Sequence, residues 1–141
     1  PARDGCLACT LVRSQGDGVV SDCHGARDQS FDNPAVARAQ RVSFVDFAQA
    51  SEIRAAMRAS PARHYMTDAA GTERCDAYIR LEAFSKDAEP LWSHLGFELC
   101  LPRANASARD ADFRGYYDDA ARVAVAEDCA EDIARFGYRF D

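Results

Sequence analysis

The sequence lacks any apolar stretch approaching the ~20 residues that a membrane-spanning helix needs, and its first residues lack a signal-peptide pattern. Internal repeats and low-complexity tracts are absent too. The composition is 48% hydrophobic and 28% charged over 141 residues. These fractions are typical of a folded globular domain rather than a disordered or fibrous chain. We therefore expect residues 1–141 to form a single soluble domain, cytoplasmic and without a membrane span.

The chain also has fewer positively charged than negatively charged residues. The chain has 17 Lys and Arg against 23 Asp and Glu, which gives a net charge of -6. Because neutralisation of phosphates drives most non-specific binding to DNA or RNA, this balance argues against a nucleic-acid partner. A small anionic ligand is still compatible with the sequence, since local arginines and helix N-termini can outweigh the overall sign.

The six cysteines lie in apolar or helical patterns rather than in loops rich in Gly and Pro. We therefore expect reduced, mostly buried thiols rather than the disulfides of a secreted domain. By count, Cys6, Cys9, Cys23 and His24 could form a zinc quartet. On a strand, however, residues 6 and 9 point to opposite faces, so the spacing does not favour a metal site and we expect none.

Two segments predict strands, an apolar run at 6–12 and an alternating run at 76–82. Capping residues and helical spacing predict helices at 17–29 with Asp17 as N-cap, 34–40, 44–60 after Ser43, 85–96 with Pro90 as a kink or a late start, and 118–136. Strands alternating with helices indicate an α/β domain with parallel strands. Two strands are few for such a sheet, so we expect the carboxyl-terminal part of a larger α/β domain.

Residues 10–24, TLVRSQGDGVVSDCH, allow three interpretations: a phosphate site between a strand and a helix, the metal site above, or a hairpin at Asp17-Gly18. The flanking residues alternate poorly, which argues against the hairpin. An Arg at the carboxyl end of a strand offers a planar fork suited to phosphate, and a helix starting near Asp17 carries Ser21 on its first turns. The alternative is that Arg13 simply pairs with Asp17 on the surface.

Several short motifs toward the carboxyl end occur in a defined order. They are IRLE (79–82), PLWSHLGF (90–97), NAS (105–107), FRGYY (113–117), EDI (131–133) and FGYRF (136–140). In this order, from about Leu11 onward, the chain resembles the carbohydrate-type sulfotransferase family, whose members use 3′-phosphoadenosine-5′-phosphosulfate (PAPS). The resemblance implies a partial P-loop-like three-layer α/β domain, a few parallel strands flanked by helices, predominantly helical in this chain.

The resemblance also implies site residues. In the family, an Arg after the strand and a Ser eight positions on bind the 3′-phosphate of PAPS; here they are Arg13 and Ser21. Ser14, Gln15 and Gly18 depart from the family pattern, which has Asn-Pro and a second Arg at these places. The family folds the loop after the NAS motif toward the cofactor, so Ser107 and Arg109 are expected to touch PAPS or its product, adenosine 3′,5′-bisphosphate.

The activity implied by the resemblance is transfer of a sulfuryl group from PAPS to a carbohydrate hydroxyl. This reaction needs a general base and cations at the transferred group. The family's phosphosulfate loop has no counterpart before Cys6. The three scattered histidines have no neighbouring carboxylate and nucleophile, which argues against a catalytic histidine and leaves the base unassigned. We expect this chain to supply the 3′-phosphate part and to be inactive or barely active alone. The alternative is a non-catalytic remnant or binding module that has lost the cofactor.

The aromatic residues at 116–117 and 136–140 are expected to form a satellite core.

Overall fold

The computed structural model describes residues 7–102 and 109–140. Its secondary structure is mostly helical with one small parallel sheet, which confirms the expected helix-rich α/β class. The chain divides into two compact units, each described by itself below. Unit 1 comprises Pro1–Arg13 and Ala62–Ala104, and unit 2 comprises Ser14–Pro61 and Asn105–Asp141. In the described ranges, no helix is long and apolar enough to cross a lipid bilayer.

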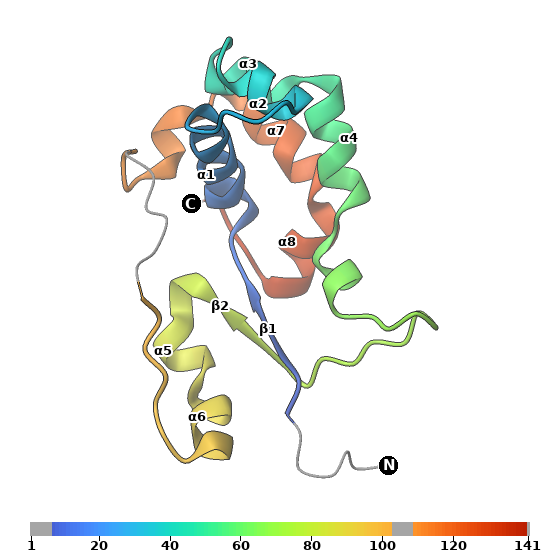
Figure 1. Ribbon diagram of the computed structural model, residues 1–141, viewed down its shortest axis with the longest axis vertical. Coiled ribbons are helices and arrows are strands. Elements are labelled where there is room, and N and C mark those ends of the chain that lie inside the picture. The colour runs from blue at the N-terminus through green and yellow to red at the C-terminus, as the bar shows by residue number, and fades with distance from the viewer. Residues whose placement is uncertain (1–6, 103–108, 141) are drawn as a thin grey trace. The chain divides into compact units, whose positions relative to one another are not determined.

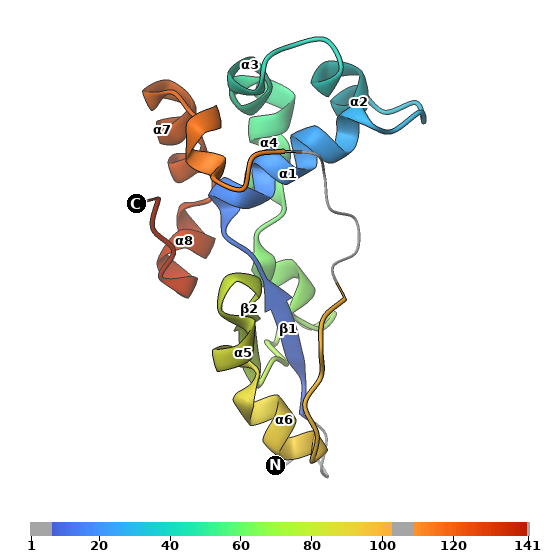
Figure 2. The same cartoon turned by 90° about the vertical axis from the view of Figure 1, so that its left-hand side faces the viewer.

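Unit 1 contains the sheet. Strands β1 (Cys9–Val12) and β2 (Ala77–Arg80) pair in parallel, with Leu11 opposite Ile79 (Figure 2). Both strands are shorter than the predicted runs, and β2 ends at Arg80 because Leu81–Ala83 turn into a 3-10 helix, η2. The core of the sheet is Ile79, only 2% exposed, whereas Leu11 is 52% exposed.

The remaining elements of unit 1 are η1 (Ala62–Tyr65), α5 (Phe84–Asp87) and α6 (Glu89–Leu95). The helix predicted at 85–96 is thus divided at Ala88. Pro90 lies in the first turn of α6, which confirms the late start, and Gly96 ends the helix with a φ of 78°. Arg80 joins the sheet to α5, since its Nε lies 2.7 Å from Oδ2 of Asp87, and this contact lowers the pKa of the Asp87 carboxyl.

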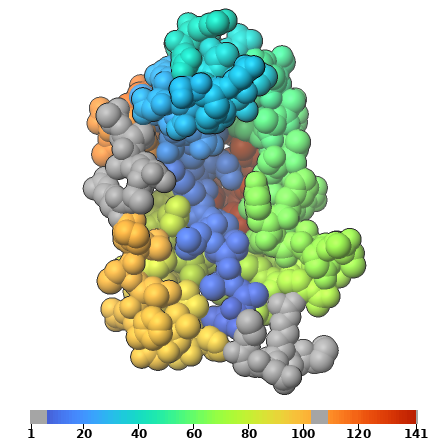
Figure 3. All heavy atoms as spheres, viewed as in Figure 1, coloured from blue at the N-terminus to red at the C-terminus, as the bar shows by residue number. Residues whose placement is uncertain are grey.

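Unit 2 is helical. It contains α1 (Gln15–Arg27), α2 (Pro34–Ala39), α3 (Phe44–Gln49), α4 (Ser51–Ala59), η3 (Phe113–Tyr116), α7 (Asp119–Asp128) and α8 (Ala130–Phe136). Helix α1 packs against α2, α3, α7 and η3, while α3 and α4 pack against α7 (Figure 1). The centre of this core includes Val20, Cys23 and Ala121, which are fully buried. The surface from α2 to α4 is continuous in the space-filling view (Figure 3).

Local signals place most helix ends in unit 2 but miss two breaks. Ser43 caps α3 as predicted, because its Oγ accepts from the Asp46 amide at 3.1 Å. The single helix predicted at 44–60 is wrong, since extended Ala50 (ψ 134°) separates α3 from α4. The helix predicted at 118–136 is likewise divided, at Cys129, and Gly137 ends α8 with a φ of 66°.

The start of α1 differs from the prediction. The helix begins at Gln15 with Ser14 in the N-cap position, so Asp17 lies inside the first turn and is not the cap. The hairpin interpretation of Asp17-Gly18 is wrong, because both residues are helical. This early start places the Asp17 side chain on a helix face rather than on the helix end.

The described cysteines differ in burial. Cys23 and Cys129 are buried in unit 2, and burial raises the pKa of the Cys129 thiol to about 11. Cys9 and Cys100 are exposed in unit 1, so the expectation of mostly buried thiols is wrong for this pair. Cys9 is exposed because it shares its side of β1 with Leu11, which is open to solvent.

Candidate functional site

One face of α1 carries three polar side chains at successive turns. Asp17, Ser21 and His24 are spaced at i, i+4 and i+7, so they follow one ridge of the helix. On the adjoining face of α1, Val20 and Cys23 are fully buried in the core of unit 2. Burial of these apolar residues fixes the rotation of the helix and thereby the direction of the polar ridge.

Arg109 reaches this ridge from 92 positions away in the sequence. Its Nη2 donates to Oδ1 of Asp17 at 2.6 Å, and the two side chains are only 12% and 19% exposed. The positive charge of Arg109 also lowers the pKa of His24, so its influence extends along the ridge. Ser21 lies between Asp17, which pairs with Arg109, and His24, whose pKa Arg109 influences.

His24 is the second unusual group of the ridge. Its Nε2 is buried and has no hydrogen-bond partner among the described residues. The ring of Tyr116 meets the imidazole edge-on at 5.1 Å. Burial, then the charges of Arg27 and Arg109, lower the pKa of His24 below 6.5, so the folded protein favours the neutral imidazole. A buried unpaired polar atom is costly and indicates a place that a ligand can complete.

The arrangement suits a small anion. Arg109 offers a guanidinium fork, and Ser21 and the neutral imidazole of His24 each offer one hydrogen-bond donor. Asp17 lies in the first turn of α1 and His24 in its last turn, so Ser21 is near the middle of the helix, where the helix dipole adds little. The carboxylate of Asp17 now holds Arg109. An incoming anion would therefore have to take over that interaction.

An open groove adjoins Ser21. It has a volume of about 430 Å³ and runs along α1 toward the start of α2. Besides Ser21, its lining includes the side chains of Asp22, Gln29, Phe31 and Asn33. The groove thus offers room beside the ridge for the remainder of a ligand whose anionic group lies at Ser21.

The four residues predicted from the sequence fall into three groups. Ser21 and Arg109 are both in unit 2, where Arg109 pairs with Asp17, one turn before Ser21 on α1. Arg13 is the last residue of unit 1 and directly precedes Ser14, the N-cap position of α1. Ser107 lies outside the described residues. His24 was missed as a site residue; its spacing of three from Ser21, on one helix face, is the signal that could have found it.

His24 gives the site a pH dependence. A His whose pKa is lowered by folding binds its proton more readily in the unfolded chain, so the free energy of unfolding falls as pH drops below 6.5. We expect the wild type to lose more stability than His24→Gln between about pH 7.5 and about pH 5.5, a range above the titration of most carboxylates. Urea unfolding at both pH values measures this; equal losses in the two proteins would contradict it.

Comparisons with protein-family models, with curated proteins and with solved structures found no match for this chain. Among residues 7–102 and 109–140, no three His, Cys, Asp or Glu side chains are grouped so that they could hold a metal ion. The functional assignment therefore depends on the polar ridge of α1, on Arg109 and on the motifs of the sequence.

Proposed function

We propose that this chain is a sulfotransferase-like protein that binds the 3′-phosphate of PAPS, or of its product adenosine 3′,5′-bisphosphate, at the polar ridge of α1. One observation supports the proposal most. Arg109 pairs with Asp17, which lies one turn before Ser21 on the same face of α1, and the family resemblance names Ser21 and Arg109 from two distant segments. Sequence register alone does not require these two segments to meet.

In this proposal the phosphate accepts hydrogen bonds from the Ser21 hydroxyl and from the Arg109 fork, which turns from Asp17 to the ligand. A phosphate at pH 7 carries more charge than a carboxylate and accepts bidentate bonds from Arg, so the exchange is favourable. The resemblance also names Arg13, the residue directly before Ser14 in the sequence, as a ligand of the 3′-phosphate. The groove beside Ser21 accommodates the nucleoside, with the amides of Gln29 and Asn33 as hydrogen-bonding groups.

The proposed architecture is P-loop-like, with the two parallel strands as part of its central sheet. The reaction transfers a sulfuryl group from PAPS to a carbohydrate hydroxyl, which attacks sulfur while adenosine 3′,5′-bisphosphate leaves. A base at the acceptor hydroxyl and cations at the sulfuryl group are further requirements of this step. Ser21, Arg109 and Arg13 serve the 3′-phosphate only. We therefore expect this chain to bind the nucleotide with little or no turnover of its own.

A second candidate is a non-catalytic module that no longer binds the nucleotide. The observation in its favour is the same ion pair, because Asp17 and Arg109 are mostly buried and already satisfy each other. The two candidates differ in what Asp17→Asn does. If the site binds phosphate, removing the competing carboxylate strengthens nucleotide binding; if the pair is only structural, the variant binds no nucleotide.

The test is isothermal titration of the whole chain with adenosine 3′,5′-bisphosphate, and with adenosine 5′-phosphate as the matched ligand that lacks the 3′-phosphate. We expect the bisphosphate to bind at least about ten-fold more tightly, the scale of one charge-assisted hydrogen bond. Equal affinity for both nucleotides, or no heat at about millimolar bisphosphate, the weak end of measurable affinities, would contradict the proposal.

A further inference from the structure

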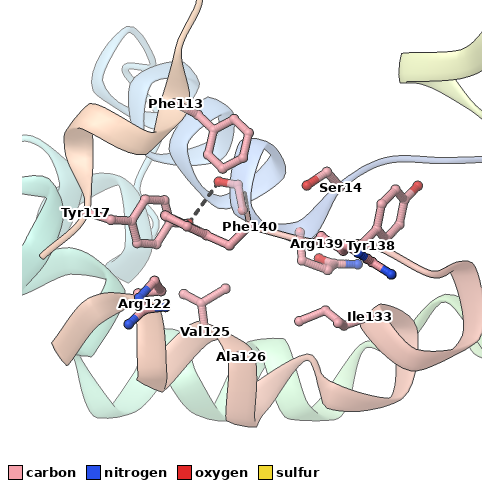
Figure 4. A pocket seen from close by; sticks show the side chains of 12 residues that line it. Ser14, Phe113, Tyr117, Arg122, Val125, Ala126, Ile133, Tyr138, Arg139 and Phe140 are labelled. Carbon is pink, nitrogen blue, oxygen red and sulfur yellow. Dashed lines mark hydrogen bonds between the residues drawn. The ribbon is translucent and has the colours of Figure 1, made fainter. Parts of the chain in front are cut away.

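Unit 2 contains a second, more enclosed cavity, apart from the polar ridge. It has a volume of about 150 Å³ and lies between the start of α1, η3, α7, α8 and the tail that follows α8 (Figure 4). Its lining is Ser14, Gln15, Gly16, Phe113, Tyr117, Arg122, Val125, Ala126, Ile133, Tyr138, Arg139 and Phe140. Most of this surface is hydrocarbon or aromatic.

The aromatic wall of the cavity is held in place by several contacts. Phe140 meets Phe113 at 5.6 Å and Tyr117 at 5.0 Å, both edge-to-face. The Tyr117 hydroxyl donates to the Gly16 carbonyl at 2.8 Å. Arg114 Nε donates to the Phe140 carbonyl at 2.8 Å, which fixes the tail. These contacts join the lining residues to one another and, through Arg114, to η3, so the aromatic side chains of the lining are fixed in place.

Gly16 allows the aromatic ring of Phe113, in the cavity lining, to pack closely against α1. A Cβ at this position would lie 2.7 Å from Cε2 of Phe113, so only glycine permits the contact. Gln15, the neighbouring lining residue, donates from Nε2 to Oδ2 of the buried Asp132 at 2.9 Å. The buried Asp132 carboxylate therefore accepts a hydrogen bond from a neutral amide.

The charged side chains in the lining are both arginines. Arg122 is 50% exposed, and its guanidinium lies 5.9 Å from the centre of the Phe140 ring. Its contact with Asp119 is long, at 3.4 Å. Arg139 is exposed, on the tail. The cavity thus combines an apolar interior with positive charge in its lining, which is the pattern that an amphipathic anion complements.

We propose that this cavity binds a small aromatic carboxylate, with the ring among Phe113, Tyr117 and Phe140 and the carboxylate at Arg139 or Arg122. Apolar cavities of about 150 Å³ stay dry and accept a benzene-sized ring. Aromatic edges favour an aromatic partner by edge-to-face contacts, and guanidinium groups bind carboxylates. A longer acyl chain or a fused ring system exceeds the volume. This inference is independent of the proposed nucleotide site.

Ligand-observed NMR with benzoate tests the proposal, with acetate as the ligand without a ring and benzyl alcohol as the ligand without a charge. For a ligand of this size we expect a dissociation constant of about 1 mM. Acetate should not bind. Benzyl alcohol should bind more weakly than benzoate. Either Arg139→Gln or Arg122→Gln should remove that difference by weakening benzoate about five-fold, as expected for an exposed charge pair, and no effect of either variant would contradict the proposed position of the carboxylate.

Two variants keep the test independent of folding. Ala126 lines the cavity but is exposed on α7, so Ala126→Trp fills the cavity without disturbing the core and should abolish benzoate binding. Val123→Trp, at a 50% exposed position of the same helix outside the cavity, is the matched control and should bind as the wild type does. Benzoate binding that survives Ala126→Trp, or its absence from the wild type at about 10 mM, ten times the expected constant, would overturn the proposal.

Discussion

Asp128→Ala is expected to lower the free energy of unfolding by about 2–3 kcal/mol, because it removes a shielded carboxylate that holds two helices together. The Asp128 side chain is 3% exposed at the end of α7. Its Oδ2 accepts from Arg54 Nε at 2.6 Å, and its Oδ1 accepts from Arg58 Nη1 at 2.6 Å, both from α4. The two arginines are partly exposed and can regain water, which keeps the cost below that of a fully buried pair.

The control is Glu52→Ala, which breaks the Arg38–Glu52 pair between side chains that are 43% and 40% exposed. Such exposed pairs contribute little, so we expect this variant to match the wild type in urea unfolding. Equal losses of stability in Asp128→Ala and Glu52→Ala would contradict the account of the α4–α7 contact.

The effect of Asp128 also depends on pH. Hydrogen bonds from Arg54 lower the pKa of the Asp128 carboxyl below its ordinary value of 3.8. A lowered pKa contributes stability that is present above the ordinary value and is lost as pH falls through the native pKa. The difference between the wild type and Asp128→Ala should therefore shrink as the pH is lowered below 3.8.

Arg109→Met is expected to weaken binding of adenosine 3′,5′-bisphosphate by about ten- to a hundred-fold, the loss of one or more hydrogen bonds to a charged group. Methionine keeps much of the apolar stem of the side chain and removes the guanidinium. The variant also leaves Asp17 without its partner at 2.6 Å, so the double variant Asp17→Asn/Arg109→Met separates loss of binding from loss of folding. Titration calorimetry of each protein gives the dissociation constants.

The matched control is Arg38→Met, an arginine of α2 that pairs with Glu52 and is not part of the polar ridge. We expect this variant to bind the bisphosphate as the wild type does. Arg13→Ala should weaken binding by a factor comparable to that of Arg109→Met, if both arginines contact the phosphate. Wild-type affinity in Arg109→Met would contradict the proposed site.

Local signals were enough to predict the position of α1 and the ends of several helices. Ser43, Gly96 and Gly137 act as the sequence indicates, because capping depends on residues within one turn. The breaks at Ala50 and Cys129 have no Gly or Pro to mark them. Tertiary packing of short helices decides these breaks, and a single sequence does not record it.

At the candidate site too, features that depend on local sequence could be predicted and long-range contacts could not. Ser21 could be placed on α1 from the sequence. The aromatic residues of the predicted satellite core meet only in part, since Tyr117 contacts Phe140 while Tyr116 and Tyr117 pack against the main core of unit 2. The partner of Arg109 could not be predicted, because Asp17 lies 92 positions away and looked like a helix cap. The ion pair between Asp128 and Arg54 could not be predicted for the same reason, since the two residues lie 74 positions apart in the sequence.

The most direct test of the central claim is an NMR titration of the ¹⁵N-labelled chain with adenosine 3′,5′-bisphosphate. We expect the backbone amide of Ser21, the imidazole of His24 and the Nε–H of Arg109 to shift together and to saturate at one concentration, while the amide of Arg58 in α4, which does not line the groove, stays unchanged. Shifts that leave Ser21 and Arg109 unaffected, or no shifts at about millimolar nucleotide, would contradict it.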